Sequence, residues 1–313
     1  MIGKITSSNF YNNKLLTQTL KFASENSAIY TAGASFGFAS VVRPVSTLLA
    51  PKTDKEDKKI SFAKSISSAF SGFLFMSLAS IPFSKAIKNI DKNPLKYLKP
   101  ETIKNLSNGL NNINDSKSYK FLTQLFKLGL GFLLAYPKAL VNNKIIPDFL
   151  NNDKNKENKP SFTGKVEKII ALAIDNKEMQ TFANKMKNTN YTTHLIALGD
   201  IFSTFAFMNI TSKNKKLSNH QKKVLNYNSL ISTGLCLAAG YSLDKISDKN
   251  MDKFIKNLTK ANKNSPDLAK YIEGSKIIKT SLIFGLVYYG LIPIFSTYLS
   301  SKLAKNNNDE IKK

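Results

Sequence analysis

Two charged residues lie inside long apolar runs, where a charge is costly to bury. Arg43 is the only arginine of the chain, and Asp200 is the only acidic residue within an apolar run. A charge near the centre of a bilayer costs about 2.5–3.5 kcal/mol or more unless it is paired or hydrated. The five donors of a guanidinium suit a carboxylate or a group of carbonyls. We predict that Arg43 and Asp200 form a polar site for a substrate or ion; extension of Arg43 to the headgroups is the alternative.

Four prolines interrupt the apolar runs, at Pro44, Pro82, Pro137 and Pro293. Proline removes a backbone hydrogen bond and crowds the preceding turn, so each position predicts a bend or a break in a helix. Broken helices are where membrane transporters place substrates and ions. A plain kink is the alternative.

Gly33 and Gly37 form a GxxxG pattern among alanines, which indicates close packing of two helices. The same stretch matches GxSxG, with Ser35 as a nominal nucleophile and His194 as a nominal base. Such a nucleophile needs a strand-to-helix turn, whereas this stretch reads as one continuous helix. We therefore predict helix packing here and no enzymatic activity, and an intramembrane serine hydrolase is the weakest of the functions considered.

Cofactor and metal motifs are missing from the sequence, which has no GxxxxGK[ST], HExxH, CxxC or EF-hand pattern. A single cysteine, Cys236, excludes an internal disulfide. His220 lies in a lysine-rich stretch and is expected to be solvated. We predict that the chain holds neither a cofactor nor a metal.

The net charge of +25 comes from lysine, since all but one of the 46 basic residues are lysines. Arginine is the side chain that forks onto phosphate and guanine, so this make-up argues against nucleic acid as a partner. Lysines near a membrane surface attract anionic headgroups with about 1 kcal/mol each. The expected partner is a lipid bilayer with anionic headgroups. A homo-oligomer and a protein partner are left open.

Six apolar stretches approach the length that crosses a membrane, for which about 20 helical residues are needed. They are residues 29–49, 66–83, 121–141, 193–211, 224–243 and 277–299. Between them the spacing of apolar residues predicts amphipathic connector helices, one along Ile103–Ile113 and one after Ser265. The fold class is therefore predicted to be an all-α, polytopic membrane helical bundle. A soluble bundle with buried helices is the alternative.

Sequence matches between the two halves predict an internal repeat of three helices each. Residues 91–99 (DKNPLKYLK) resemble residues 248–256 (DKNMDKFIK) at an offset of 157, and Gly129 and Pro137 correspond to Gly285 and Pro293 at an offset of 156. Three crossings per half would invert the second half relative to the first. With six spans the loops hold 20 lysines on one side and 22 on the other, as equally basic inverted halves would. Hairpins that dip into the membrane and return would explain this balance equally well.

These observations predict five segments along the chain. They are an amphipathic N-terminal segment (1–28), a first three-helix repeat (29–150), a polar linker (151–160), a second three-helix repeat (161–299) and a disordered basic tail (300–313). The functional hypothesis is a multi-pass membrane protein that acts as a small-solute or ion transporter with its site at the repeat interface. A membrane-anchored structural or interaction protein with lysine-rich loops is the alternative.

Overall fold

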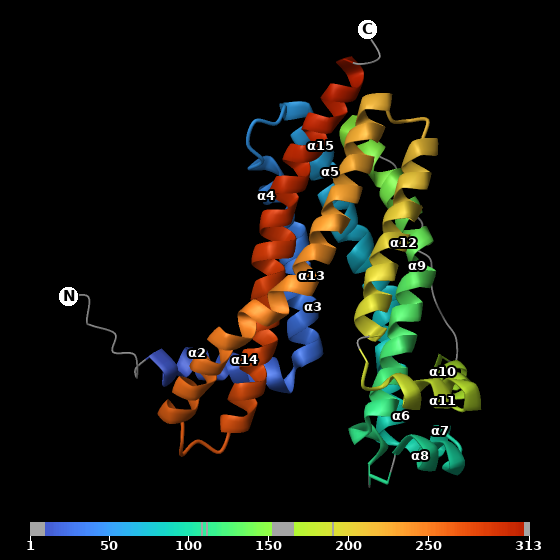
Figure 1. Ribbon diagram of the computed structural model, residues 1–313, viewed down its shortest axis with the longest axis vertical. Coiled ribbons are helices and arrows are strands. Elements are labelled where there is room, and N and C mark those ends of the chain that lie inside the picture. The colour runs from blue at the N-terminus through green and yellow to red at the C-terminus, as the bar shows by residue number, and fades with distance from the viewer. Residues whose placement is uncertain (1–9, 108, 111, 152–165, 190, 310–313) are drawn as a thin grey trace, which may run out of the picture. The chain divides into compact units, whose positions relative to one another are not determined.

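The computed structural model describes residues 10–107, 109–110, 112–151, 166–189 and 191–309 (Figure 1). Every regular element in these ranges is a helix, which confirms the predicted all-α class. The α-helices are α2 (Lys14–Glu25), α3 (Ser27–Gly37), α4 (Arg43–Leu48), α5 (Lys55–Phe75), α6 (Ile81–Lys92), α7 (Pro94–Tyr97), α8 (Pro100–Ser107), α9 (Lys117–Asn151), α10 (Val166–Ile174), α11 (Lys177–Met186), α12 (Tyr191–Lys213), α13 (Asn219–Ala261), α14 (Leu268–Ile283) and α15 (Ile292–Asp309). Three π-helical segments, η1 (Phe38–Val42), η2 (Met76–Ser80) and η4 (Phe284–Leu291), and a 3-10 helix, η3 (Ile113–Asp115), complete the described elements.

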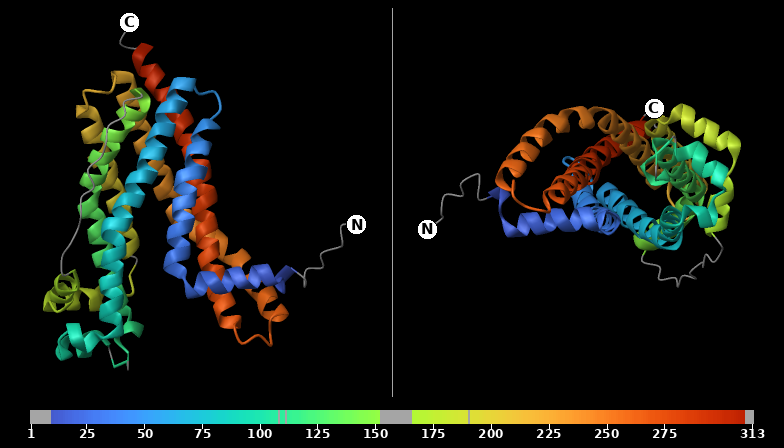
Figure 2. Two further views of the ribbon diagram at one scale, coloured as in Figure 1. Left: turned by 180° about the vertical axis from the view of Figure 1, so that it is seen from behind. Right: turned by 90° about the horizontal axis from the view of Figure 1, so that it is seen from below.

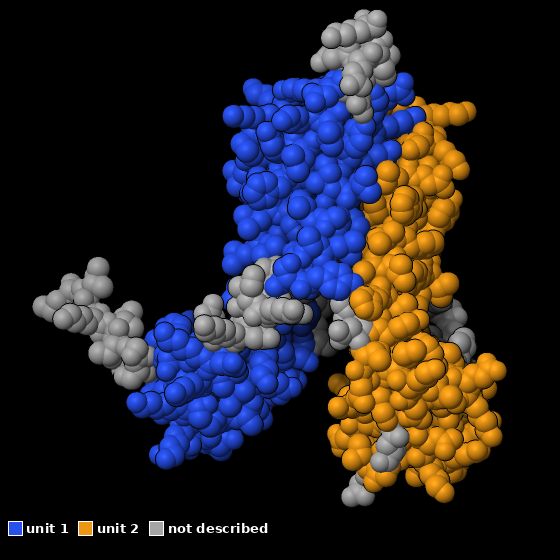
Figure 3. Space-filling view, in the orientation of Figure 1, with its two compact units in different colours: residues 1–69, 219–313 blue, residues 70–218 orange. Residues whose placement is uncertain are grey.

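The helices group into two compact units, which Figure 3 shows in different colours. Unit 1 comprises residues 1–69 and 219–313, and unit 2 comprises residues 70–218. The chain leaves unit 1 within α5 and returns to it at α13. Unit 1 is therefore assembled from both ends of the sequence, and unit 2 from the middle.

Unit 1 is a bundle in which α13 packs lengthwise against α15 (Figures 1 and 2). α3, η1 and α4 follow one another directly, and this stretch contacts η4 and α15. Hydrogen bonds connect α5 with α13 and α15. Side chains from α4, α5, α13 and α15 thus enclose the interior of this unit.

An amphipathic helix, α2, lies across α14 in unit 1 (Figure 1). Asn13 caps α2 with its side-chain oxygen, and Leu20 and Ala23 are buried. A Cβ built on Gly274 of α14 would lie 1.8 Å from the backbone oxygen of Leu20, so only glycine allows the two helices to approach this closely. The predicted amphipathic N-terminal segment is helical over Lys14–Glu25.

Unit 2 combines a helical hairpin with a small apolar-cored body. α9 and α12 run side by side (Figures 1 and 2). The small body, here called the headpiece, comprises the described parts of residues 86–122 and 166–191, and its core includes Ile90, Leu106, Leu122 and Ile174. Leu106 and Ile113, from the predicted stripe, are both buried in this core. The predicted connector helix is confirmed only in part, because α8 ends at Ser107, Leu110 is exposed, and Ile113 belongs to the separate 3-10 helix η3.

Three helical stretches of the described chain are long and apolar enough to cross a membrane. They are Lys55–Lys92, His194–Lys213 and Leu268–Asn306. These stretches contain the predicted spans 66–83 and 277–299, and they contain the predicted span 193–211 except for its first residue. The other three predicted spans are also helical. Polar residues lower their mean hydropathy, including Arg43 in the first, Lys127 in the second and Asn228 in the third. The structure thus supports a helical protein with three helices suited to a membrane.

The predicted segment boundaries differ from the two units because contacts define the units, whereas sequence likeness defines the repeats. The two DKN motifs have different local structure: Pro94 begins α7 in the first, and the second lies within the uninterrupted helix α13. The internal repeat stays a prediction.

Apart from Asn151, the predicted linker 151–160 lies outside the described residues. The predicted disordered tail is corrected in part, because α15 continues as helix to Asp309.

Three of the four prolines predicted to interrupt helices follow a π-helical segment. η1 ends two residues before Pro44, η2 two residues before Pro82 and η4 two residues before Pro293. In each case an α-helix continues through the proline, so these positions are junctions rather than ends of helices. Pro137 lies inside α9, which is assigned as α-helix throughout.

The hydrogen bonds at two of these junctions explain why the π segments are there. The backbone N–H groups of Arg43 and Ile292 bond to the carbonyls of Phe38 and Val287, each five residues earlier. A proline ring crowds the carbonyl four residues before it, and a wider turn relieves that contact. A wide turn thus ends just before Pro44 and just before Pro293.

Candidate functional site

Unit 1 buries many polar side chains beside apolar ones such as Ile60 and Leu225, and it exposes other apolar side chains. Its buried polar residues are Ser46 and Thr47 on α4; Asp57, Ser61, Lys64, Ser65 and Ser67 on α5; Asn228 and Ser229 on α13; Ser275 and Ser281 on α14; and Ser296, Thr297, Ser300 and Ser301 on α15. In contrast, Val41, Leu286 and Phe295 are exposed, and Leu286 keeps 68% of its surface accessible. A soluble protein has the reverse distribution. An apolar exterior around a polar interior is typical of a helical bundle that stands in lipid.

Serine hydroxyls can line this interior because most of them are satisfied within their own helix. The hydroxyl of Ser65 donates to the carbonyl of Ser61, that of Ser229 to Leu225 and that of Ser300 to Thr297. Such bonds to the preceding turn remove much of the cost of burying a hydroxyl. These hydroxyls therefore need no hydrogen-bond partner on another helix when they are buried.

One end of the interior is closed by a cluster of three side chains from three helices. Asp57 of α5 is only 1% exposed, and its Oδ1 lies 2.7 Å from Nε2 of His220 on α13. Its Oδ2 accepts a hydrogen bond of 2.5 Å from the hydroxyl of Ser301 on α15. Both carboxylate oxygens are thus engaged, as a buried carboxylate requires. This cluster joins α5, α13 and α15 at one level.

A second cluster lies two turns further along the same helices. Lys64 is 6% exposed, and its Nζ donates to Oδ1 of Asn228 at 2.8 Å. Nδ2 of Asn228 faces the hydroxyl oxygens of Ser296 and Thr297, each at 3.4 Å. Between the two clusters lies Ser61, whose buried hydroxyl has no hydrogen-bond partner in the described part of the chain. Polar groups therefore continue from one cluster to the next.

Arg43 extends the polar interior beyond Lys64. It is the first residue of α4, and its charge acts on both Lys64 and Tyr289. Cys236 lies about 4.4 turns along α13 from His220 and interacts with the same two residues. We call the set from the Asp57 cluster to Arg43 the polar column.

The length of the polar column can be estimated along α13. His220 and Cys236 are 16 residues apart in an uninterrupted helix, which corresponds to about 24 Å at 1.5 Å per residue. The hydrocarbon core of a bilayer is about 30 Å thick. The stretch of α13 from His220 to Cys236 is therefore slightly shorter than a hydrocarbon core is thick.

The two residues predicted to form a site belong to different units. Arg43 lies in unit 1 and is part of the polar column, whereas Asp200 lies on α12 in unit 2 and is exposed. Ser35 and His194, considered for a hydrolase, are also divided between the units, and Ser35 lies within the helix α3 rather than at a strand-to-helix turn. Neither predicted pair is held within one compact unit.

Sequence reasoning missed most of the polar column. Lys64 flanks the predicted span 66–83, so it was read as part of a loop, and His220 was expected to be solvated but contacts Asp57. The available signal was the spacing of polar residues on α5, at positions 57, 61, 64 and 68, which repeats every three or four residues. That stripe is a polar helix face, and its burial depends on helices far away in sequence.

The glycines that permit close packing are also different from the predicted ones. A Cβ built on Gly33 or Gly37 meets no described atom within 4 Å. A Cβ on Gly285 would lie 2.6 Å from the ring of Phe38. Close approach therefore occurs where η1 meets η4, and the GxxxG stretch is not packed in this way within the described chain.

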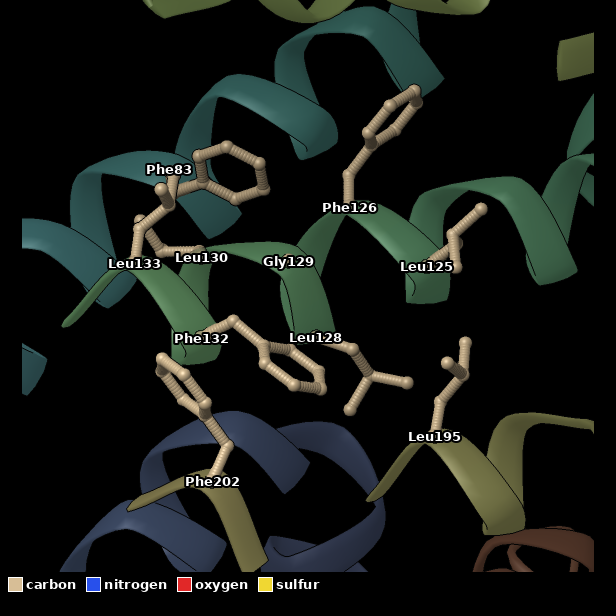
Figure 4. A pocket seen from close by; sticks show the side chains of 10 residues that line it. All are labelled: Phe83, Leu125, Phe126, Leu128, Gly129, Leu130, Phe132, Leu133, Leu195 and Phe202. Atoms are coloured by element: carbon tan, nitrogen blue, oxygen red, sulfur yellow. The ribbon is translucent and has the colours of Figure 1, made fainter. Parts of the chain in front are cut away.

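Unit 2 contains an apolar cavity of about 700 Å³ between α6, α9 and α12 (Figure 4). Four phenylalanines, Phe83, Phe126, Phe132 and Phe202, point their rings into or along it. The lining residues are all apolar, so the cavity suits a hydrocarbon chain and offers no polar side chain to hold a headgroup or a substrate.

Among the described residues no group of three or more His, Cys, Asp or Glu side chains could hold a metal ion. The chain also has no match among protein families, curated proteins or solved structures. The arrangement of its own side chains is therefore the basis for a functional proposal.

Proposed function

We propose that this chain is a multi-pass integral membrane protein in which unit 1 conducts a small hydrophilic solute or ion along the polar column. The observation that carries the proposal is the inverted distribution of side chains in unit 1, with Lys64 and Asp57 inside and Leu286 outside. In water, polar side chains are favoured at the protein surface, where they are solvated. In lipid, apolar side chains are favoured at the surface and polar groups in the interior, so this distribution supports a bundle surrounded by lipid.

The polar column supports conduction rather than simple anchoring. An anchor needs only apolar helices, whereas charged groups in a membrane are costly and usually serve a pathway for substrates or ions. The column combines ionisable groups at both clusters, which are about 10 Å apart along α5, with the hydroxyl of Ser61 between them. Hydroxyls and amides of this kind replace part of the water shell of a passing solute.

The finer arrangement that we propose has six crossings in two inverted halves of three, with Arg43 in the conducting path. The matches at offsets of 156 and 157 and the nearly equal lysine counts support it. Asp200 is proposed as a separate polar position in unit 2, to be tested by Asp200→Asn.

The test is solute flux through vesicles that contain the purified full chain. Vesicles are loaded with glycerol, potassium chloride or potassium nitrate, and efflux is compared with protein-free vesicles. Cys236 is the only cysteine, so a methanethiosulfonate reagent modifies one position, inside the column. We expect efflux of at least one solute in the wild type and its inhibition when Cys236 is modified.

The variant Cys236→Ala is the matched control, since it should conduct and resist the reagent. The proposal is wrong if no solute leaves faster than from empty vesicles, or if flux is unaffected after mass spectrometry shows complete modification of Cys236. Either result would leave no role for the column in transport.

A second function has one observation in its favour. The headpiece has an apolar core of the soluble type and carries exposed lysines, including Lys92, Lys96, Lys104 and Lys177. We propose as the alternative that this chain is a membrane-anchored interaction protein whose lysines bind anionic lipid. Replacing these four lysines with glutamate should then reduce binding to vesicles that contain phosphatidylglycerol and leave solute flux unchanged.

A further inference from the structure

We propose that the apolar cavity of unit 2 binds one acyl chain of an anionic phospholipid (Figure 4). This inference rests on the membrane setting of the proposed function, and it does not depend on conduction by the polar column. Four features of unit 2 support it, namely the lining of the cavity, its length, its position beside the headpiece and the charge of the headpiece.

The lining of the cavity matches a hydrocarbon chain. α6, α9 and α12 contribute ten residues to it, and each of them is apolar. The volume of about 700 Å³ lies within the roughly 300–1,000 Å³ that ligand pockets occupy. Since no polar side chain lines the cavity, a ligand gains affinity there by burying methylene groups.

The length of the cavity matches the depth of one leaflet. Its lining residues run from Leu125 to Leu133 on α9 and from Leu195 to Phe202 on α12. At 1.5 Å per residue these stretches are about 12 Å and about 10 Å long. One leaflet contributes about 15 Å, which is half of the hydrocarbon core. One chain of a phospholipid in this leaflet can therefore lie along the cavity.

The cavity begins at the headpiece, where the leaflet would meet water. Phe83, Leu125 and Phe126 line the cavity and also pack against the apolar core of the headpiece. On α12 the lining begins at Leu195, the second residue of the apolar stretch His194–Lys213. The headpiece end of the cavity is therefore at the end of an apolar stretch, which is the level of lipid headgroups.

The headpiece carries the charge that an anionic headgroup would meet. Its described residues include eleven lysines and six acidic residues, so its net charge is positive. Asp200, on α12, lies about 7 Å beyond Leu195 on the side away from the headpiece, and it does not line the cavity. Lysines near a membrane surface attract anionic headgroups. The headpiece therefore favours an anionic phospholipid over a zwitterionic one.

Two glycines of α9 provide a blocking variant and its matched control. Gly129 lines the cavity and Gly131 does not, and a Cβ built on either one meets no described atom within 4 Å. Gly129→Leu should fill part of the cavity, and Gly131→Leu should bring the same gain in helix propensity outside it. Displacing about two methylene groups of a bound chain corresponds to about a tenfold loss of affinity.

The test is photo-crosslinking of the full chain in phosphatidylcholine vesicles that contain a trace of phosphatidylglycerol with a diazirine on one acyl chain. Peptide mass spectrometry locates the label. In the wild type and in Gly131→Leu we expect label on the lining residues of α9 and α12, and excess unlabelled phosphatidylglycerol should remove it. Gly129→Leu should lower this label about tenfold and leave unchanged the label on Leu286, an exposed residue of unit 1.

The label map of the wild type needs no variant, so it is decisive even if Gly129→Leu does not fold. Label spread evenly over exposed apolar residues would overturn the site, and so would equal label at the cavity in Gly129→Leu and Gly131→Leu. Equal labelling by a diazirine phosphatidylcholine would overturn the assignment to an anionic lipid. A dimer that Gly129→Leu abolishes, with no label at the cavity, would mean that a second copy occupies it and that the lipid assignment is wrong.

The outcomes also separate this site from the proposed function. Label at the cavity without solute flux would overturn conduction and keep the lipid site. Solute flux with an even spread of label would keep conduction and overturn the lipid site. Extraction of the chain from vesicles without detergent would overturn the membrane setting on which both depend.

Discussion

The bundle of unit 1 buries charged side chains, whereas the headpiece of unit 2 has none among its described buried residues. The headpiece packs Ile90, Leu106 and Leu122 inside and holds its few buried polar groups in specific bonds, such as that from the hydroxyl of Tyr119 to Oδ1 of Asp91 at 2.6 Å. The bundle packs Lys64 and Asn228 inside and keeps Leu286 outside. Under the proposed function, the difference reflects two solvents: water would drive burial of apolar surface in the headpiece, and lipid would not do so around the bundle.

The largest expected effect is in the headpiece. Leu106→Ala removes a fully buried side chain and should reduce the free energy of unfolding of the headpiece by about 2–5 kcal/mol. Hydrogen exchange of the headpiece amides would report this loss. Leu95→Ala is the control, because Leu95 is exposed and its truncation should change stability by less than about 0.5 kcal/mol. Equal effects of the two changes would contradict the assignment of an apolar core.

A smaller effect is expected at Tyr119. Tyr119→Phe removes its hydrogen bond to Asp91 and should cost the headpiece about 1 kcal/mol at neutral pH. Burial and the hydrogen bond to Asp91 raise the pKa of the Tyr119 phenol above its usual value. The folded state therefore holds the proton more tightly than the unfolded state. Its contribution to stability is complete below about pH 10 and is lost as the pH rises beyond that.

The wild-type headpiece should consequently lose stability above about pH 10 more steeply than Tyr119→Phe does. Denaturation followed by hydrogen exchange or circular dichroism at a series of alkaline pH values would measure the difference. Parallel pH curves for the two proteins would show that Tyr119 is not the group responsible.

The smallest effect on stability is expected in the bundle, at Lys64. Lys64→Met replaces a buried ammonium with an apolar side chain of similar length. The cost of burying the ammonium disappears and the hydrogen bond to Asn228 is lost, so the two changes should cancel to within about 0.5 kcal/mol. The detergent-solubilised protein should keep its unfolding midpoint. A loss of stability as large as that of Leu106→Ala would mean that Lys64 serves the fold, and the contrast between the two regions would fail.

Much of the helical organisation could be predicted from the sequence. The six apolar runs are all helical, the α8–η3 connector follows the stripe of Leu106 and Ile113, and α14 begins just after Asp267 as the Ser265 turn indicated. These features depend on the spacing of neighbouring residues, and local hydrogen bonds and helix periodicity are sufficient to produce them. The prolines were likewise recognised as special positions, although the π turns before three of them were not foreseen.

The candidate site depends on contacts between residues far apart in the chain. The sequence by itself marked Arg43 as unusual, because it is the only arginine and lies in an apolar run. It could not show that Lys64 meets Asn228, 164 positions later, or that Asp57 meets Ser301. A buried charge and a solvated one have the same local sequence, and only the helices that cover Lys64 and Asp57 distinguish them. Tertiary structure therefore decided which polar residues form a column, and the sequence decided which helices were available to build it.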